Sequence, residues 1–310
     1  MKLSELINYR NQLNELSALL VLNTANAELD KVLHLVNAQP ELMNSITHDL
    51  TTHYHTIQQA FNNFEEDLDN LKSQLKSKIE KAERPWFQEG YNLYDKGETD
   101  YAEDILNNRQ AHAPDSAPFR SRLTQYANWK HSAMIIRPGL ETFIDDMVAY
   151  DPLYLVDLSH DFLRPAMGKF NEQYQNRLRP YVVKESIDDE ILGKLPNGQF
   201  GMCLAYNYFN FRPFEIIKKY LAEVFDKLKP GGVFAFTFND CDRPSAVVLV
   251  ENYYCCYTPG YLVRELATTM GYEIVYSYND PGPSTWIEIR KPGELDSLKG
   301  GQTLAKILPK

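Results

Sequence analysis

Short apolar runs alternate with amphipathic segments through the second half of this 310-residue chain, and this alternation restricts the fold more than any other feature. The stretch from Ala133 to Ala166 shows it best. It has an apolar run at 133–136, a Pro-Gly turn, a segment with apolar residues at helical spacing, and an apolar run that ends on Asp157. Strands and helices that alternate in this way form a mostly parallel sheet with helices on both faces. Ligands of such sheets bind at the carboxyl ends of the strands.

The same reasoning predicts where strands and helices lie between residues 131 and 292. We expect strands at 133–137, 152–157, 180–185, 200–207, 232–238, 272–278 and 284–290. We expect helices at 139–149, 161–175, 213–228 and 259–270. The turn sequence at 279–283 leaves room only for a hairpin between the last two strands. The predicted fold class is therefore α/β, with five parallel strands followed by an antiparallel hairpin.

Residues 1–83 carry a different, helical pattern, with apolar residues at spacings of three, four and seven. These residues are Leu6, Leu13, Leu16, Leu20, Ile57, Phe61, Phe64, Leu68, Leu71 and Leu75. Because proline lacks a helix donor, Pro40 should break this region and Pro85 should end it. Neither helix can bury its apolar stripe alone. The pattern predicts either a coiled coil that makes the chain a homo-oligomer or an intramolecular hairpin that packs on the second domain.

These patterns divide the chain into four parts. We assign 1–83 to a helical coiled-coil or assembly region, 84–130 to a helical connecting region, 131–292 to the α/β domain and 293–310 to a C-terminal tail. The connecting region is dense in aromatic residues, which at that density are typical of a core or an interface.

Charge and composition exclude several classes of partner. The formal net charge of −10 gives no broad attraction to nucleic acid or to anionic lipid. The sequence has no apolar run of about 18 residues, and its N-terminus lacks the basic and apolar regions of a signal peptide. We expect a soluble cytoplasmic protein without a membrane partner, located in a host cytoplasm or a virion if the chain is viral. The cysteines show no zinc-ligand spacing, so we expect no metal; they are Cys203, Cys241, Cys255 and Cys256.

Three motifs in the α/β region resemble those of class I S-adenosylmethionine-dependent methyltransferases. The segment Leu228–Thr237 (LKPGGVFAFT) is similar to the L-K-P-G-G turn that enters the fifth strand of that family. Val156–Ser159 (VDLS) resembles the end of the family's second strand, where an acid binds the ribose of the cofactor. Tyr257–Val275 resembles the helix and sixth strand that follow. The resemblance spans 133–290 and implies a Rossmann-like methyltransferase sheet that uses S-adenosyl-L-methionine.

The first motif of this family departs from its usual form here. Where the family has a turn such as E-I-G-P-G-L-G-T, this chain reads IIRPGLET from Ile135 to Thr142. Gly139 is retained, but Arg137 and Glu141 stand in place of the other two glycines. Those glycines let the backbone approach the methionine part of the cofactor. The two side chains therefore either turn away or fill the space, and in the second case the site is closed.

The resemblance implies cofactor contacts at the carboxyl ends of four strands. Asp157 would bind the ribose, and Glu185 or Ser186 would stand for the third-strand acid that binds the adenine amine. A loop carboxylate, however, needs no ligand. The complete set of candidate cofactor residues is Arg137, Gly139, Glu141, Asp157, Leu158, Glu185, Ser186 and Tyr206.

Candidate acceptor contacts follow the fourth and fifth strands. Asn207 and Tyr208 stand where amino-directed methyltransferases carry an Asn-Pro-Pro-Tyr turn, and would hold the methyl acceptor. Without the two prolines, simple packing of these side chains is the alternative. Asp240 would act as a general base, unless it belongs to a solvated loop.

Two functional hypotheses follow. The first is a methyltransferase that acts on a small molecule or a protein side chain. The alternative is a methyltransferase fold without cofactor that serves as a scaffold or interaction module, for example in a viral particle or another oligomeric assembly. A nicotinamide-dependent enzyme is disfavoured because no G-x-G-x-x-G follows the first strand.

Overall fold

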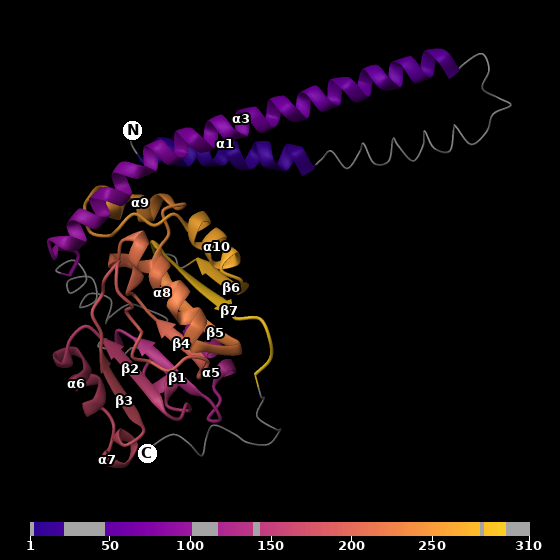
Figure 1. Cartoon of the computed structure of the whole chain (residues 1–310). Helices are drawn as coiled ribbons and strands as arrows, with labels where there is room; N and C mark the ends of the chain where they lie inside the picture. Colours follow the sequence, from indigo (N-terminus) through magenta and orange to yellow (C-terminus); the bar gives the residue numbers. More distant parts are fainter. Residues whose placement is uncertain (1–2, 22–46, 101–116, 139–142, 280–281, 296–310) are drawn as a thin grey trace. The chain divides into compact units, whose positions relative to one another are not determined.

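The computed structural model describes residues 3–21, 47–100, 117–138, 143–279 and 282–295 (Figure 1). The chain divides into two compact units, Met1–Pro85 and Trp86–Lys310. Gly139 and Glu141 lie outside the described residues, as do Pro40 and the end of the C-terminal tail.

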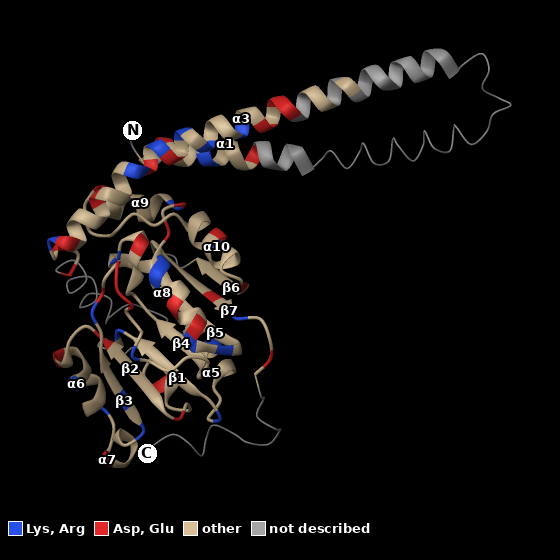
Figure 2. Cartoon of the chain, in the orientation of Figure 1, with Lys and Arg blue, Asp and Glu red and all other residues tan. Residues whose placement is uncertain are grey.

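The first unit consists of helix α1 (Leu3–Val21) and the part of helix α3 (Thr47–Asp95) that precedes residue 86. Arg10 of α1 donates to Glu83 of α3 over 2.6 Å, and both side chains are buried. Leu3 and Leu6 are buried as well, while charged residues of both signs lie along the described part of α3 (Figure 2). The unit thus contains an intrachain helix pair. The coiled coil and the homo-oligomer have no support in the described residues and stay predictions.

Helix α3 continues through Pro85 to Asp95, so the predicted helix end at Pro85 is wrong. A proline inside a helix removes one hydrogen bond, but tertiary packing can compensate. Within the second unit, the ring of Phe87 lies 5.6 Å from that of Phe214 and 5.1 Å from that of Tyr257. These contacts hold the last turns of α3 on the α/β unit.

The second unit is built on one seven-stranded sheet in the order β3-β2-β1-β4-β5-β7-β6. The strands are β1 (Ser132–Ile136), β2 (Leu153–Asp157), β3 (Leu178–Val182), β4 (Phe200–Ala205), β5 (Leu228–Asn239), β6 (Glu273–Asn279) and β7 (Ser284–Arg290). Strands β1 to β5 pair in parallel, and β7 is antiparallel to both β5 and β6. Strand β6 therefore runs with the first five. Six parallel strands replace the predicted five, because the second arm of the hairpin, β7, is the one that pairs with β5.

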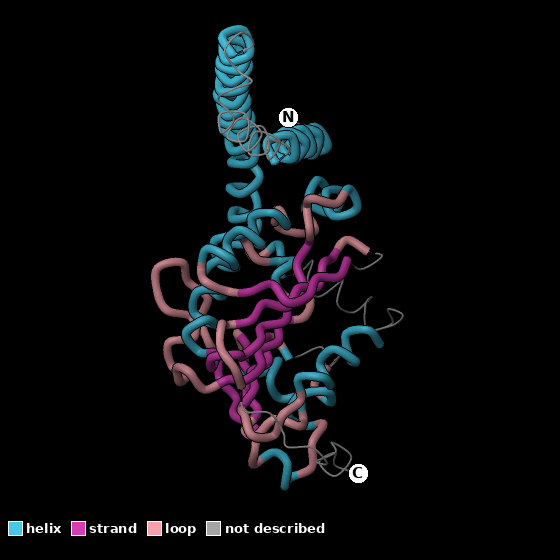
Figure 3. Tube along the Cα trace, turned by 90° about the vertical axis from the view of Figure 1, so that its right-hand side faces the viewer, coloured by secondary structure: helices cyan, strands magenta, loops and turns pink. Residues whose placement is uncertain are grey.

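Helices cover both faces of this sheet (Figure 3). They are α5 (Ala117–Tyr126), α6 (His160–Gly168), α7 (Glu172–Gln175), α8 (Phe214–Lys227), α9 (Pro244–Glu251) and α10 (Gly260–Thr269), with short 3-10 turns η3 (Asp145–Met147) and η4 (Phe209–Phe211). The described part of the predicted helix at 139–149 contains only η3. The predicted helix at 161–175 is two helices, because the Asn171 side chain accepts from the backbone N–H of Tyr174 and caps α7.

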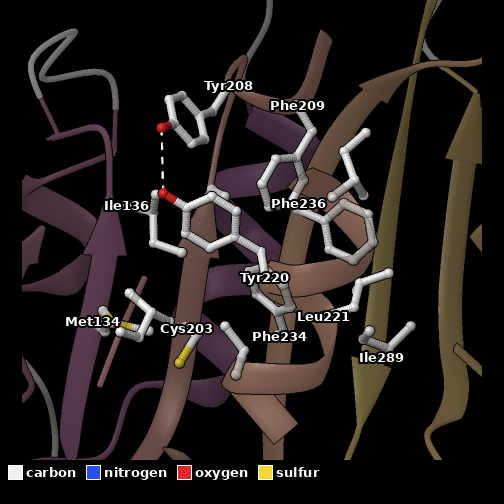
Figure 4. Close-up of a cluster of buried hydrophobic side chains, with 14 of the residues drawn as sticks. Met134, Ile136, Cys203, Tyr208, Phe209, Tyr220, Leu221, Phe234, Phe236 and Ile289 are labelled. Atoms are coloured by element: carbon white, nitrogen blue, oxygen red, sulfur yellow. Dashed lines mark hydrogen bonds between the residues drawn. The ribbon is translucent and has the colours of Figure 1, made fainter. Parts of the chain in front are cut away.

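Alternate strand residues enter two separate cores. Ile136 and Val156 belong to the core under α8 and α10, whereas Ile135 and Leu155 belong to the core under α5 and α6. Figure 4 shows the first core, where Tyr220 of α8 lies among apolar side chains of the strands. The predicted α/β sheet with both faces covered is confirmed.

Gly231, in the L-K-P-G-G segment, requires the absence of a side chain. Its φ is +78°, and a Cβ would lie 2.6 Å from the backbone nitrogen of Leu295. We expect Gly231→Ala to lower the free energy of unfolding by about 1–3 kcal/mol, since both the backbone angle and the contact disfavour alanine. Urea denaturation measures this. Gly168→Ala is the matched control, because no atom lies within 4 Å of its added methyl group; equal destabilisation by both variants would contradict the explanation.

Candidate functional site

The chain winds outward from β1 in one direction and from β4 in the other, so the sheet has its switch point between these two strands. Open α/β sheets bind ligands in the crevice at the carboxyl ends beside this point. Arg137 directly follows β1 and Asn207 lies two residues after β4, and both have a left-handed backbone, with φ of 60° and 50°. This conformation costs Arg137 about 1–2 kcal/mol, and it costs Asn207 less, because asparagine adopts it more readily than most residues. The left-handed backbone on both sides of the switch point marks this edge as the candidate site.

Asp157 ends β2, and its side chain is completely buried. One carboxylate oxygen, Oδ1, accepts from the backbone N–H of Leu158 at 2.7 Å and from Arg137 Nη1 at 3.0 Å. The other oxygen, Oδ2, is buried without a hydrogen-bond partner among the described residues. Burial raises the pKa of this carboxyl group, although Arg137 opposes the shift. A hydroxyl donor at Oδ2 would stabilise the charged form and satisfy the oxygen.

Arg137 turns toward this acid. Its side chain is 9% exposed, and its guanidinium carbon lies 3.8 Å from the centroid of the Phe162 ring on α6. Its backbone N–H donates to the carbonyl of Val156 at 2.8 Å. Arg137 therefore lies between Asp157 and Phe162, and the choice between the two possibilities left open by the sequence stays a prediction.

Glu185 lies three residues after β3 and is not a solvated loop residue, because only 2% of its side chain is exposed. Oε2 accepts from Tyr94 at 2.8 Å and lies 2.9 Å from Nε of Arg212, whose side chain is 1% exposed. Oε1 accepts from the Tyr208 hydroxyl. The neighbouring Ser186 instead accepts from the backbone N–H groups of residues 188 and 189, and so caps a turn.

The three residues after β4 lie in different surroundings. Tyr206 packs edge-on against the Phe143 ring, 4.7 Å away, in the core under α5. The Asn207 backbone N–H donates to Oγ1 of Thr237 at 2.7 Å. Tyr208 is buried in the opposite core, where its hydroxyl also bonds to that of Tyr220 at 3.3 Å (Figure 4). Burial raises the pKa of Tyr208 well above its ordinary value.

Asp240 directly follows β5 and is buried rather than solvated. Oδ2 accepts from the Thr285 hydroxyl at 2.8 Å, and Oδ1 accepts from the backbone N–H of Asp242 at 3.1 Å. The guanidinium of Arg264 lies 3.6 Å from Oδ2. These contacts fix the carboxylate next to the start of α10.

The structure brings the candidate residues together in two pairs, Arg137 with Asp157 and Glu185 with Tyr208. Sequence reasoning missed Phe162 and Arg212 as their neighbours. Phe162 lies three residues after the segment Val156–Ser159, so its proximity to Asp157 could have been inferred from the sequence, whereas no pattern in the sequence pointed to Arg212. Within the described ranges, no group of three His, Cys, Asp or Glu side chains could hold a metal ion. No helix in the described part of the chain has the length and hydropathy that a membrane span needs.

Comparison with known proteins finds similarity in structure alone. No family model matches the sequence, and no curated protein matches it. An O-methyltransferase family protein from Burkholderia thailandensis is similar at 12% identity and a TM-score of 0.47, over 62% of this chain and 60% of that one. The 1,6-didemethyltoxoflavin-N1-methyltransferase of the same organism, with bound 1,6-didemethyltoxoflavin and S-adenosylhomocysteine, is similar at 16% identity and a TM-score of 0.46, over 65% of this chain and 90% of that one.

A possible exported protein from Bordetella parapertussis is similar at 12% identity and a TM-score of 0.45, over 56% of this chain. This chain covers 66% of the length of that protein and 60% of the O-methyltransferase family protein, less than two thirds of each. At these identities and TM-scores the likeness gives no information on activity, which has to be argued from the site.

Proposed function

We propose that the α/β unit is an S-adenosylmethionine-dependent methyltransferase. The observation that supports this most is the buried Oδ2 of Asp157 at the carboxyl end of β2, which has no hydrogen-bond partner among the described residues. A buried acceptor of this kind requires a donor, and a ribose hydroxyl is a donor of suitable chemistry. The residues present therefore fit the nucleoside part of the cofactor. Arg137, in place of a glycine, is the part of the site that departs from the family.

S-adenosylmethionine supplies an activated methyl group when bound, so the protein mainly has to align the acceptor. In this proposal Asp157 binds the ribose. Asn207, whose backbone is held by Thr237, and Asp240 lie at the ends of β4 and β5, the neighbouring strands. They would position a small-molecule or protein acceptor, and Asp240 would accept a proton where the acceptor has one to lose.

Titration calorimetry with S-adenosylmethionine tests the proposal. We expect saturable binding by the intact chain and binding about 10- to 100-fold weaker by Asp157→Asn, because a charged hydrogen-bond acceptor contributes about 1.5–3 kcal/mol. Asp161→Asn is the matched control, since this nearby side chain is 82% exposed and should leave the affinity unchanged. Absence of heat at millimolar cofactor, with folded protein, would refute the proposal.

A second candidate function is a scaffold or interaction module without cofactor, with homo-oligomers formed through residues 1–83. The contact between Arg137 and Asp157 favours it, because a buried ion pair within the site competes with a ligand. This candidate predicts no cofactor binding by the intact chain and new binding by Arg137→Gly. The same calorimetry separates the two functions.

A further inference from the structure

Arg137 and Asp157 form a buried ion pair in the absence of a ligand, in which Nη1 of Arg137 contacts Oδ1 of the carboxylate. If the Arg137 side chain simply turned out into water, Asp157 would stay buried and charged without its cation. Breaking a buried ion pair in this way is costly in free energy. A ligand can open the pair at lower cost when it offers a partner to both residues. The chemistry of the two residues therefore defines such a ligand: it carries a hydroxyl donor for the acid and an anion for the guanidinium.

S-adenosylmethionine has both groups, the ribose hydroxyls and the α-carboxylate of its methionine part. The position of Arg137 suits an anionic group of the ligand, because Arg137 directly follows β1 beside the switch point, where open α/β sheets bind ligands. The backbone N–H of Arg137 is already bonded to the carbonyl of Val156, so a ligand would be bound by N–H groups of the guanidinium. A guanidinium binds a carboxylate through two parallel hydrogen bonds.

We propose that Arg137 exchanges partners when the cofactor binds: its guanidinium releases Asp157 and binds the α-carboxylate of the cofactor instead. This inference rests on the proposed function and adds a residue that determines cofactor specificity. Oδ1 of Asp157 then keeps the backbone N–H of Leu158 and, together with Oδ2, can accept from the ribose, while Arg137 stays paired. Phe162 on α6, which already contacts the guanidinium, provides a flat surface along which the guanidinium can move. Arg137 thus acts as a carboxylate-binding residue in place of the missing glycine.

The test compares two probes that differ only in the carboxylate, S-adenosylmethionine and decarboxylated S-adenosylmethionine. We measure the affinity of both for the intact chain, Arg137→Gln and Arg137→Lys by calorimetry. The intact chain should prefer the carboxylate form by about tenfold or more, since a charge-assisted hydrogen bond is lost without it. Arg137→Gln should bind both probes equally within about threefold, and Arg137→Lys should keep part of the preference, because it keeps the charge but loses the paired geometry.

Arg164→Gln is the matched control, because Arg164 also lies near Asp157 in sequence but its side chain is 79% exposed. This variant should keep the full preference. If Arg137→Gln tightens or weakens both probes by the same factor, Arg137 is an obstruction or a structural residue and the inference is wrong. If the intact chain binds neither probe, the proposed function itself fails, and the inference with it. Circular dichroism confirms that each variant is folded before titration.

Discussion

Replacing Glu185 with alanine is expected to lower the free energy of unfolding of the α/β unit by about 3–5 kcal/mol, the cost of breaking a buried ion pair from one side. Arg212, whose side chain is 1% exposed, would keep its charge and the longer contact of Nη1 with Asp100 at 3.7 Å, but it would lose the carboxylate that lies 2.9 Å from its Nε. The hydroxyl of Tyr94 would lose this acceptor, and the hydroxyl of Tyr208 would keep only the longer bond to Tyr220 among those described above. Because Tyr94 lies on α3, the last turns of that helix should also lose protection from amide hydrogen exchange.

Urea denaturation followed by circular dichroism measures this effect. Glu265→Ala serves as the matched control, because Glu265 is an exposed residue of α10 and alanine is a good helix former. We expect a change within about 0.5 kcal/mol for this control. A loss below about 1 kcal/mol for Glu185→Ala would mean that Arg212 finds water or another acceptor, and that the cluster does not stabilise the unit.

The sheet could be predicted from the sequence because strands that are buried on both faces consist of continuous apolar runs such as Leu153–Val156. The order of the last two strands could not. The turn at 279–283 specifies a hairpin, but its residues are the same whichever arm pairs with β5. Only the side chains facing the two cores, Trp286 and Ile287 among them, select β7 for the inner place.

The helices were less predictable where local and tertiary preferences disagree. The apolar spacing of Phe143 and Met147 predicts a helix, yet both residues reach their core from a segment whose described part holds a single 3-10 turn. Pro85 predicts a helix end, yet α3 continues because Phe87 packs on the α/β unit. Neither the burial of Phe143 and Met147 in their core nor the packing of Phe87 can be inferred from the residues next to them in the sequence.

The candidate site shows the same division. Asp157 could be identified because an acid at the end of an apolar run is a local pattern. The contact of Arg137 with Asp157 follows once β1 and β2 are paired, since Ile136 lies opposite Val156. The Glu185 cluster could not be foreseen, because Tyr94, Glu185 and Arg212 come from three segments joined only by the fold.

Replacing Trp286 with alanine is expected to destabilise the α/β unit by about 3–5 kcal/mol, as large aromatic deletions from a core do. Trp286 on β7 is fully buried, and its ring stacks on that of Phe119 from α5 with centroids 4.5 Å apart. Its Nε1 donates to Oε1 of Glu288 at 2.9 Å. The variant therefore loses apolar contact between α5 and the sheet, and it removes one donor from a buried carboxylate.

Trp129→Ala is the matched control, because this tryptophan is 40% exposed and should cost much less when truncated. Trp286→Phe keeps most of the ring volume but not the donor to Glu288, so it separates the two contributions. Arg122 and Tyr126 still bind Glu288 in either variant, and we expect Trp286→Phe to cost about 1–2 kcal/mol. Urea denaturation measures all three. If Trp286→Ala and Trp129→Ala cost the same, the stacked pair does not hold α5 on the sheet, and the anchorage of α5 has to be assigned to the ion pair of Arg122 with Glu288 instead.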